Sequence, residues 1–114
     1  AMAQDCLFCK IIQGDIPADT LYEDDEVLAF RDIAPAAPIH FLVIPKKHLS
    51  GPSAVTEEDE QLMGKLLRIG NQVAQQEGIE QFRLVFNSGA EAGQTVFHIH
   101  MHVLGGRSLN WPPG

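Results

Sequence analysis

The sequence predicts a single α+β domain with a mostly antiparallel sheet, and three observations lead to this class. The 114 residues are enough for one hydrophobic core and too few for two. Short apolar segments are separated by turn residues, a pattern typical of hairpin-connected strands. One long amphipathic segment, residues 56–78, has the apolar spacing of a helix. A single domain over residues 1–114 is therefore expected, with helices packed on a sheet.

Two helices and five strands are expected along the chain. The strands are predicted where short apolar runs are bounded by turn residues, at residues 20–23, 27–30, 40–44, 82–86 and 98–104. A short helix is predicted over residues 5–13, with Asp5 as a candidate N-cap. The long helix is expected to begin at the N-cap Thr56 and to end at Gly78.

The composition limits the classes of function. The formal net charge is −7, and broad binding to nucleic acid or to anionic membranes needs a basic surface, so neither partner is expected. No apolar run approaches the roughly 20 residues of a membrane-spanning helix. No secretory signal is visible, so we expect a cytoplasmic protein. Residues 1–4 are expected to be disordered, and residues 107–114 to form an irregular tail.

The segment from His98 to Leu104 is the strongest candidate for a functional site. Three histidines alternate with apolar residues, and side chains alternate between faces along a strand. We therefore expect His98, His100 and His102 on one face of a strand and the apolar residues in the core. The histidines could be a surface cluster without a role, a metal site, or a nucleophile with supporting imidazoles.

The loop before this segment favours an anionic ligand. Gly89 and Gly93 permit unusual backbone conformations and close approach of a ligand, while Gln94 and Thr95 add side-chain donors. Successive backbone N–H groups in such a loop can form an anion-binding concavity. The alternative interpretation is an ordinary tight turn. Beside histidines, a donor-rich loop is more typical of phosphate binding than of a closed metal site.

These residues resemble the histidine triad (HIT) family. The segment from His98 to Leu104 fits the family pattern His-φ-His-φ-His-φ-φ, where φ is apolar. The resemblance extends over residues 30–33, 40–48, 93–97 and 111–114. The ending resembles the histidine triad nucleotide-binding (Hint) branch, whose members hydrolyse purine nucleoside phosphoramidates. The resemblance implies a HIT-like fold and an adenosine 5′-monophosphoramidase that releases AMP.

The resemblance also implies roles for the histidines. His100 would be the nucleophile that attacks phosphorus and forms a histidyl-AMP intermediate. His102 would contact the phosphate or the leaving group, and Thr95, where the family commonly has serine, would donate to the same atoms. His98 would either orient the site or ligate zinc.

The remaining nucleotide contacts follow from the resemblance as well. Asp32 would accept from the ribose hydroxyls, and Asn87 with the backbone of Gly93 and Gln94 would hold phosphate and ribose. The base would lie among apolar side chains, although core packing alone would also account for each of them. These side chains are Phe8, Ile11, Ile16, Phe30, Ile33 and Leu42. His40, at the start of an apolar strand, is expected to be structural.

The two cysteines form Cys6-Leu7-Phe8-Cys9, a spacing that indicates a metal site or free thiols. Some members of the family, mainly bacterial, bind zinc through two cysteines and two histidines. The matching positions are Cys6, Cys9, His48 and His98, a tetrahedral Cys₂His₂ set. Zinc there would be structural and catalysis would not need it. The alternative is two reduced cysteines packed as small apolar residues.

The resemblance implies a homodimer with one continuous sheet, joined through the long helix and the strand 82–86. Trp111 in the tail would then reach the active site of the partner and influence the leaving group. Two other functions stay open. The first is a dinucleoside polyphosphate hydrolase that uses the same His100 chemistry, and the second is a nucleotide- or zinc-binding interaction module with little turnover.

Overall fold

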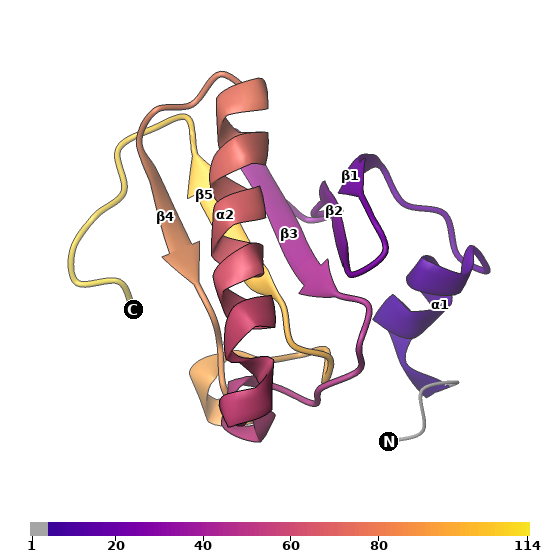
Figure 1. The fold of residues 1–114 in the computed structure, drawn as a ribbon. Coiled ribbons are helices and arrows are strands. Elements are labelled where there is room, and N and C mark those ends of the chain that lie inside the picture. The colour runs from indigo at the N-terminus through magenta and orange to yellow at the C-terminus, as the bar shows by residue number, and fades with distance from the viewer. Residues whose placement is uncertain (1–4) are drawn as a thin grey trace.

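The computed structural model describes residues 5–114, which form a five-stranded antiparallel sheet with a helix packed on each face (Figure 1). The strand order is β1-β2-β3-β5-β4. The strands are β1 (Thr20–Glu23), β2 (Val27–Arg31), β3 (Ile39–Pro45), β4 (Phe82–Val85) and β5 (Met101–Gly105), and the helices are α1 (Leu7–Gln13) and α2 (Glu60–Gln76). The predicted α+β class and five-stranded antiparallel sheet are confirmed. The prediction for residues 1–4 lies outside the described residues.

The long helix α2 crosses one face of the sheet (Figure 1). Leu66, Ile69 and Val73 on α2 are fully buried against alternate strand residues such as Phe41 and Val103. Gly70 allows this close approach, since a Cβ there would lie 2.5 Å from Cε of Met101. Thr56 forms a capping box with Asp59, but it caps a 3-10 turn, Glu57–Asp59, and the N-cap of α2 is Asp59, which corrects the predicted start of the helix. Gly78 follows the helix with a φ of 81°.

The short helix α1 packs on the opposite face. Phe8 and Cys9 of α1 are buried against Phe30, Leu42 and Ile44. Because residues 42 and 43 point to opposite faces, β3 separates this second core from the one beneath α2. The helix begins one residue later than the Asp5 cap predicted: its N-cap is Cys6, whose sulfur accepts from the Cys9 N–H at 3.4 Å.

The histidine segment is only partly a strand, which corrects the prediction for residues 98–104. The ladder of β5 starts at Met101, so only His102 of the three histidines is in it. In the register of β3 and β5 Ile99 would face Pro45, but the Ile99 N–H instead donates to the carbonyl of Leu49 at 2.7 Å. A shared surface is nevertheless kept, because the His98 and His100 rings both pack against Phe8.

The described chain, residues 5–114, contains no helix that is both long and apolar enough to cross a bilayer. The sheet ends in two edge strands, β1 and β4. The second of these lies beside the C-terminal tail, where the Arg83 guanidinium donates to the carbonyl of Asn110 at 2.9 Å. Residues 106–114, which follow β5, contain no helix or strand.

Candidate active site and metal tetrad

A cavity of about 260 Å³ lies on the α1 side of the sheet. Most of its wall is apolar, and its polar side chains include a carboxylate, a hydroxyl and two imidazoles. The lining residues are Leu7, Phe8, Ile11, Phe30, Arg31, Asp32, Ile33, Leu42, Thr95, Val96, His100 and His102. A few polar groups on a mostly apolar wall are typical of a small-molecule site.

His100 is held in one tautomer by the backbone. Its Nδ1 lies 2.8 Å from the carbonyl oxygen of His98, and a carbonyl can only accept, so Nδ1 carries the proton. The lone pair of a neutral His100 is therefore on Nε2. The ring is 7% exposed, and Phe8 packs edge-on against it with ring centres 5.1 Å apart. This arrangement orients an unprotonated nitrogen in a wall of the cavity, as a nucleophile requires.

His102 is linked to a second buried imidazole on β3. The Ala36 N–H donates to Nδ1 of His40 at 3.0 Å, so a neutral His40 carries its proton on Nε2. That nitrogen lies 2.9 Å from Nδ1 of His102 and 3.4 Å from a carboxylate oxygen of Asp32. When His102 accepts this proton in a hydrogen bond, its own proton must lie on Nε2. The two neighbouring triad histidines thus have complementary roles, one as acceptor and one as donor.

Burial keeps these histidines uncharged near neutral pH. It lowers the pKa of His102 to about 4, and the proximity of His100 and His40 adds to the shift while Asp32 opposes it. Burial likewise lowers the pKa of His40, again against the effect of Asp32. A neutral His102 can donate from Nε2 without the cost of a buried charge.

The glycine loop is fixed by the side chain of Gln94. The side-chain oxygen of Gln94 accepts from the Gly89 N–H at 2.8 Å, and its nitrogen donates to the carbonyls of Ser50 at 2.8 Å and Val96 at 3.1 Å. The side-chain amide is therefore used within the protein, which corrects the expectation that it is a donor for the ligand. Gly89 and Gly93 have φ of 92° and 100°, conformations that favour glycine.

Asp32 lies where β2 has ended and the loop toward β3 begins. One carboxylate oxygen accepts from the Ala34 N–H at 2.8 Å, and the other lies near His40. The side chain is 18% exposed and lines the cavity, so lone pairs remain accessible to a ligand hydroxyl. Ile33, beside it, is completely exposed.

Most of the predicted nucleotide contacts lie around this one cavity. Its lining includes nine predicted residues: Phe8, Ile11, Phe30, Asp32, Ile33, Leu42, Thr95, His100 and His102. Four others, Ile16, Asn87, Gly93 and Gln94, are not among the lining residues. Ile16 instead lies in the turn after α1, where its N–H donates to the carbonyl of Lys10 at 3.4 Å.

The structure adds Leu7, Arg31 and Val96 to the cavity wall. Leu7 could have been noticed as the residue beside Phe8 in the cysteine motif, and Val96 as the residue after Thr95. Arg31 could have been noticed in the same way, because it stands between Phe30 and Asp32, although its guanidinium pairs with Asp19 and Glu77.

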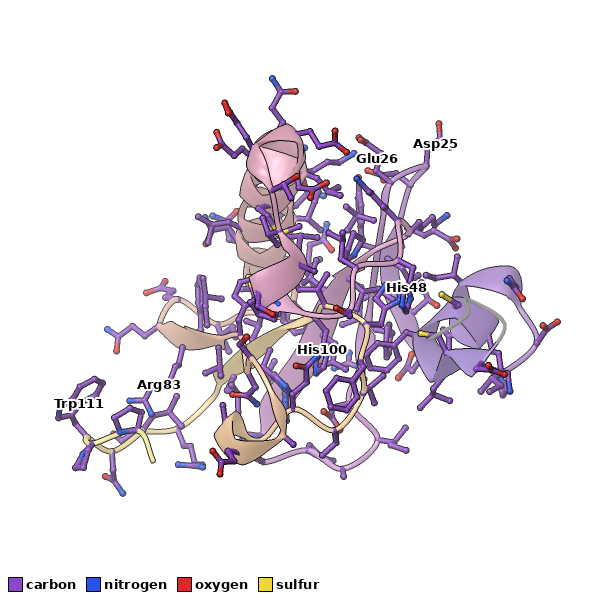
Figure 2. All side chains as sticks on the ribbon, turned by 90° about the horizontal axis from the view of Figure 1, so that it is seen from below. Asp25, Glu26, His48, Arg83, His100 and Trp111 are labelled. Carbon is purple, nitrogen blue, oxygen red and sulfur yellow. The ribbon has the colours of Figure 1, made fainter. Side chains whose placement is uncertain are left out.

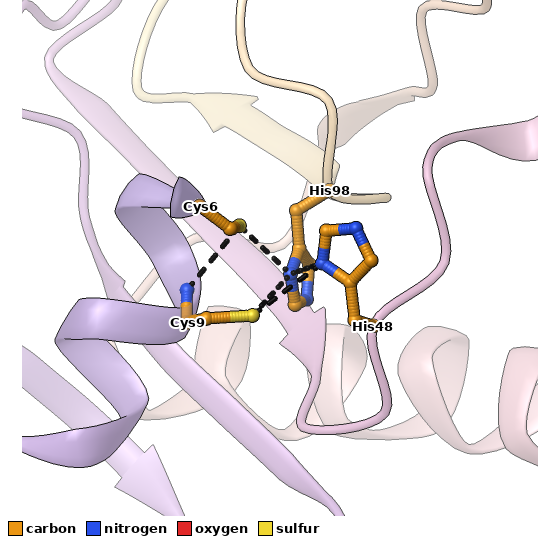
Figure 3. A group of neighbouring side chains, drawn as sticks. All are labelled: Cys6, Cys9, His48 and His98. Carbon is orange, nitrogen blue, oxygen red and sulfur yellow. Dashed lines mark hydrogen bonds between the residues drawn. The ribbon is translucent and has the colours of Figure 1, made fainter. Parts of the chain in front are cut away.

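A second cluster shares His98 with the triad and brings it together with Cys6, Cys9 and His48 (Figure 3). Their ligand atoms all lie within 4.8 Å of one another. Nδ1 of His98 is 3.4 Å from Sγ of Cys6 and 3.6 Å from Sγ of Cys9, and Nδ1 of His48 is 3.4 Å from Sγ of Cys9. The two Nδ1 atoms are 3.1 Å apart. We call these four residues the tetrad.

The tetrad has the dimensions of a tetrahedral zinc site. With Zn–S near 2.3 Å and Zn–N near 2.0–2.1 Å, a sulfur and a nitrogen ligand lie about 3.6 Å apart, and two nitrogens about 3.3 Å apart. The observed distances agree within a few tenths of an ångström. Nε2 of His98 also donates to the Pro45 carbonyl at 2.8 Å, which leaves Nδ1 unprotonated toward the sulfurs.

Burial, together with neighbouring Cys6, raises the pKa of the Cys9 thiol to about 11. Burial also lowers the pKa of His98 to about 4. Without a cation, the tetrad therefore holds a protonated Cys9 and a neutral His98, and zinc would have to displace the thiol proton. Both cysteines are free, so their side chains fit either a metal site or packed thiols.

Trp111 does not line the cavity of its own chain. The indole is 80% exposed, and Figure 2 shows it at the outer end of the tail, apart from His100.

Comparisons with known proteins agree with the fold and the motif. The HIT domain model matches residues 13–109. An uncharacterized HIT-like protein of Synechocystis sp. is 58% identical over 114 residues, which are 99% of this chain and all of that protein. A second such protein, from Synechococcus elongatus, is 54% identical over the same shares of the two chains.

Solved structures show the same similarity. A HIT family hydrolase from Legionella pneumophila has a TM-score of 0.93 and 51% identity, covering 96% of this chain and 99% of its own. A HIT family hydrolase from Clostridium thermocellum has a TM-score of 0.92 and 43% identity, covering 94% and 95%. The family match, with the triad and its cavity, shows that this chain belongs to the HIT family and is hydrolase-like.

Proposed function

We propose that this protein hydrolyses the P–N bond of purine nucleoside 5′-phosphoramidates, of the AMP-NH₂ or AMP-lysine type, and of acyl-adenylates at the corresponding bond. The observation that carries the proposal is the fixed tautomer of His100 in the cavity. Its Nδ1–H donates to the His98 carbonyl, so Nε2 is the nitrogen available to attack phosphorus.

The first half of the reaction forms a bond from Nε2 of His100 to phosphorus and breaks the P–N bond. The departing amine leaves with a proton that the substrate nitrogen takes from solvent, and the Nε2–H of His102, positioned by the hydrogen bond from His40, donates a hydrogen bond to the leaving group or the phosphate. Thr95 lines the same cavity and would donate its hydroxyl to the phosphate or to the leaving group. The charge that forms on His100 would be stabilised by the carbonyl at its Nδ1–H.

The second half releases AMP from His100. Water attacks phosphorus, the bond to His100 breaks, and AMP leaves with the oxygen from water. The proton lost by the attacking water returns to solvent, and His102 stays neutral with its Nε2–H hydrogen-bonded to the phosphate. Each residue thus returns to its starting protonation state, and no cofactor is needed for this chemistry.

Specificity for a purine nucleoside would come from shape and from the ribose. Asp32 offers acceptor lone pairs for the ribose hydroxyls, and the apolar wall around Phe8, Phe30 and Ile33 suits a flat base. Asn87 and the backbone N–H groups of Gly93 and Gln94 would hold the phosphate and ribose. A Cβ at Gly93 would lie 3.5 Å from Nδ2 of Asn87, so the side chain of Asn87 lies close to this loop.

A comparison of substrates tests the proposal. Adenosine 5′-phosphoramidate should be turned over faster than diadenosine polyphosphates, and His100→Ala should abolish hydrolysis while AMP still binds. Faster cleavage of the anhydride would instead indicate a dinucleoside polyphosphate hydrolase. Binding of AMP without turnover of either substrate would indicate an interaction module.

We also propose that the tetrad holds structural zinc and that the chain forms a homodimer. When bound, zinc would supply a cross-link between α1, His48 and His98.

Dimerisation is supported by the edge position of β4 and by the exposure of Leu67 on α2 and of Phe86 after β4. Trp111 would then contact the leaving-group side of the partner's site. Metal analysis of protein purified without a metal column and sedimentation equilibrium test the two statements.

A further inference from the structure

We propose that the tetrad controls the nucleotide cavity, so that zinc and a purine nucleotide bind with positive cooperativity. This inference rests on the proposed function and on the tetrad's fit to zinc. It differs from a purely structural role for the metal, because it makes metal occupancy a determinant of nucleotide affinity. Three features carry it: a residue shared by the two sites, a helix shared by the two sites, and the small size of that helix.

His98 is the shared residue. Its side chain contributes Nδ1 to the tetrad, whereas its backbone carbonyl accepts from Nδ1 of His100 at 2.8 Å. The ring is fully buried and is fixed at its other nitrogen by the Pro45 carbonyl. A change in the position of the His98 ring would therefore be transmitted through one residue to the atom that sets the His100 tautomer. No longer chain of contacts is needed.

The motif Cys6-Leu7-Phe8-Cys9 is the shared segment. Its two outer residues face the tetrad, and its two inner residues line the cavity. Phe8 is the more informative of the inner pair. Its ring lies edge-on against His100 at 5.1 Å and against Phe30 at 5.5 Å, measured between ring centres. Fixing the two sulfurs thus fixes the aromatic wall of the cavity and the packing behind His100.

The helix that carries this motif has little stability of its own. α1 has only seven residues, and isolated helices shorter than about 12–15 residues are marginal in water. Its N-cap is the sulfur of Cys6, which is also a tetrad ligand. Without a metal, two buried thiols and two imidazoles remain in contact with no ion to hold them together. We therefore expect the metal-free protein to sample arrangements in which α1 and the cavity wall are displaced.

Linkage makes the effect reciprocal. If the nucleotide binds the ordered arrangement more tightly, zinc must tighten nucleotide binding by the same factor by which the nucleotide tightens zinc binding. Couplings of this kind are commonly about 5- to 150-fold. Because the shared contacts are short and few residues intervene, we expect at least about 5-fold.

Calorimetry with AMP as the probe tests the inference. AMP is titrated into zinc-loaded protein and into protein stripped with a chelator, with circular dichroism to check that the stripped protein is folded. Zinc affinity is measured by chelator competition with and without AMP. Tighter AMP binding to the loaded protein, with an equal gain for zinc, supports the inference, whereas equal AMP affinities overturn it. A tetrad that binds no zinc also overturns it but leaves the proposed function intact, while failure of both forms to bind AMP contradicts the proposed function itself.

Two variants and one spectroscopic measurement sharpen the test. Phe8→Leu keeps all four ligands, so it should leave zinc affinity without AMP nearly unchanged and reduce the coupling factor. Gln13→Ala, at the exposed end of the same helix, should change neither quantity. If the stripped protein is unfolded, cobalt replaces zinc, and AMP should shift the visible ligand-field bands of the loaded protein. Bands that do not respond to saturating AMP would overturn the inference.

Discussion

Replacement of Gln94 should loosen the glycine loop by a predictable amount. The side chain is 4% exposed and makes three hydrogen bonds, to Gly89, Ser50 and Val96. Gln94→Met keeps the length of the side chain and removes all three. Net contributions are about 1 kcal/mol per bond, and water can reach the exposed Gly89 and Ser50. We therefore expect a loss of about 3 kcal/mol in the free energy of unfolding.

Gln94→Glu should be worse at neutral pH, which separates hydrogen bonding from size. A carboxylate still accepts from the Gly89 N–H, but its other oxygen faces the Ser50 and Val96 carbonyls, and the charge is buried. Urea unfolding at pH 7 should rank the wild type first, then Gln94→Met, then Gln94→Glu, and both variants should raise KM for the phosphoramidate. Gln76→Met, on the exposed end of α2, serves as the control and should stay within about 0.5 kcal/mol. A Gln94→Glu variant as stable as the wild type would refute this reasoning.

Three further predictions use other parts of the molecule. Gly70→Ala should stabilise the protein less than Gly64→Ala, because the terminal methyl of Met101 must move to admit the new Cβ, whereas Gly64 has open space around its Cβ and should gain about 0.5–1 kcal/mol; equal urea midpoints would contradict this. Asp32→Asn keeps the acceptor for Ala34 and should weaken AMP binding about 10-fold, with a smaller loss for a 2′,3′-dideoxy analogue; equal losses in calorimetry would argue against a ribose contact. The pKa of His102 is lowered to about 4, so between about pH 6.5 and 4 the unfolded chain binds a proton that the folded chain does not. As the pH is lowered through this range, the free energy of unfolding should decrease by at most about 3 kcal/mol because of this group. His102→Gln should make this fall in the urea midpoint shallower, and an unchanged slope would exclude His102 as its source.

The fold was predictable because its patterns are local. The apolar run at residues 40–44 and the glycine after the long helix, Gly78, each reflect an interaction within a few residues, and the structure confirms both. Thr56 caps a 3-10 turn that leads into α2, so the start of the long helix was predicted only approximately. Strand ends depend instead on partners. The alternation from His98 to Leu104 correctly predicted which side chains share a surface, yet a ladder requires a facing strand, and β3 has ended before it could pair with His98.

The site was predictable where residue type dictates chemistry and less so where geometry decides. Spacing and family pattern brought His100, Asp32 and the cysteines into consideration. The use of Gln94 inside the loop could not be read from the sequence, since an amide can serve a ligand or the protein equally well. The link from His40 to His102 was also missed, because it depends on neighbouring strands that are distant in the sequence.

The most direct test of the account is to trap the covalent intermediate. Rapid acid-free quenching of the protein with a slow phosphoramidate substrate, followed by peptide mass spectrometry, should find one adenylyl group on His100. The same adduct should be absent from His100→Ala and should accumulate when the second step is slowed. An adenylyl group on another residue, or full turnover by His100→Ala, would contradict the claim that His100 is the nucleophile.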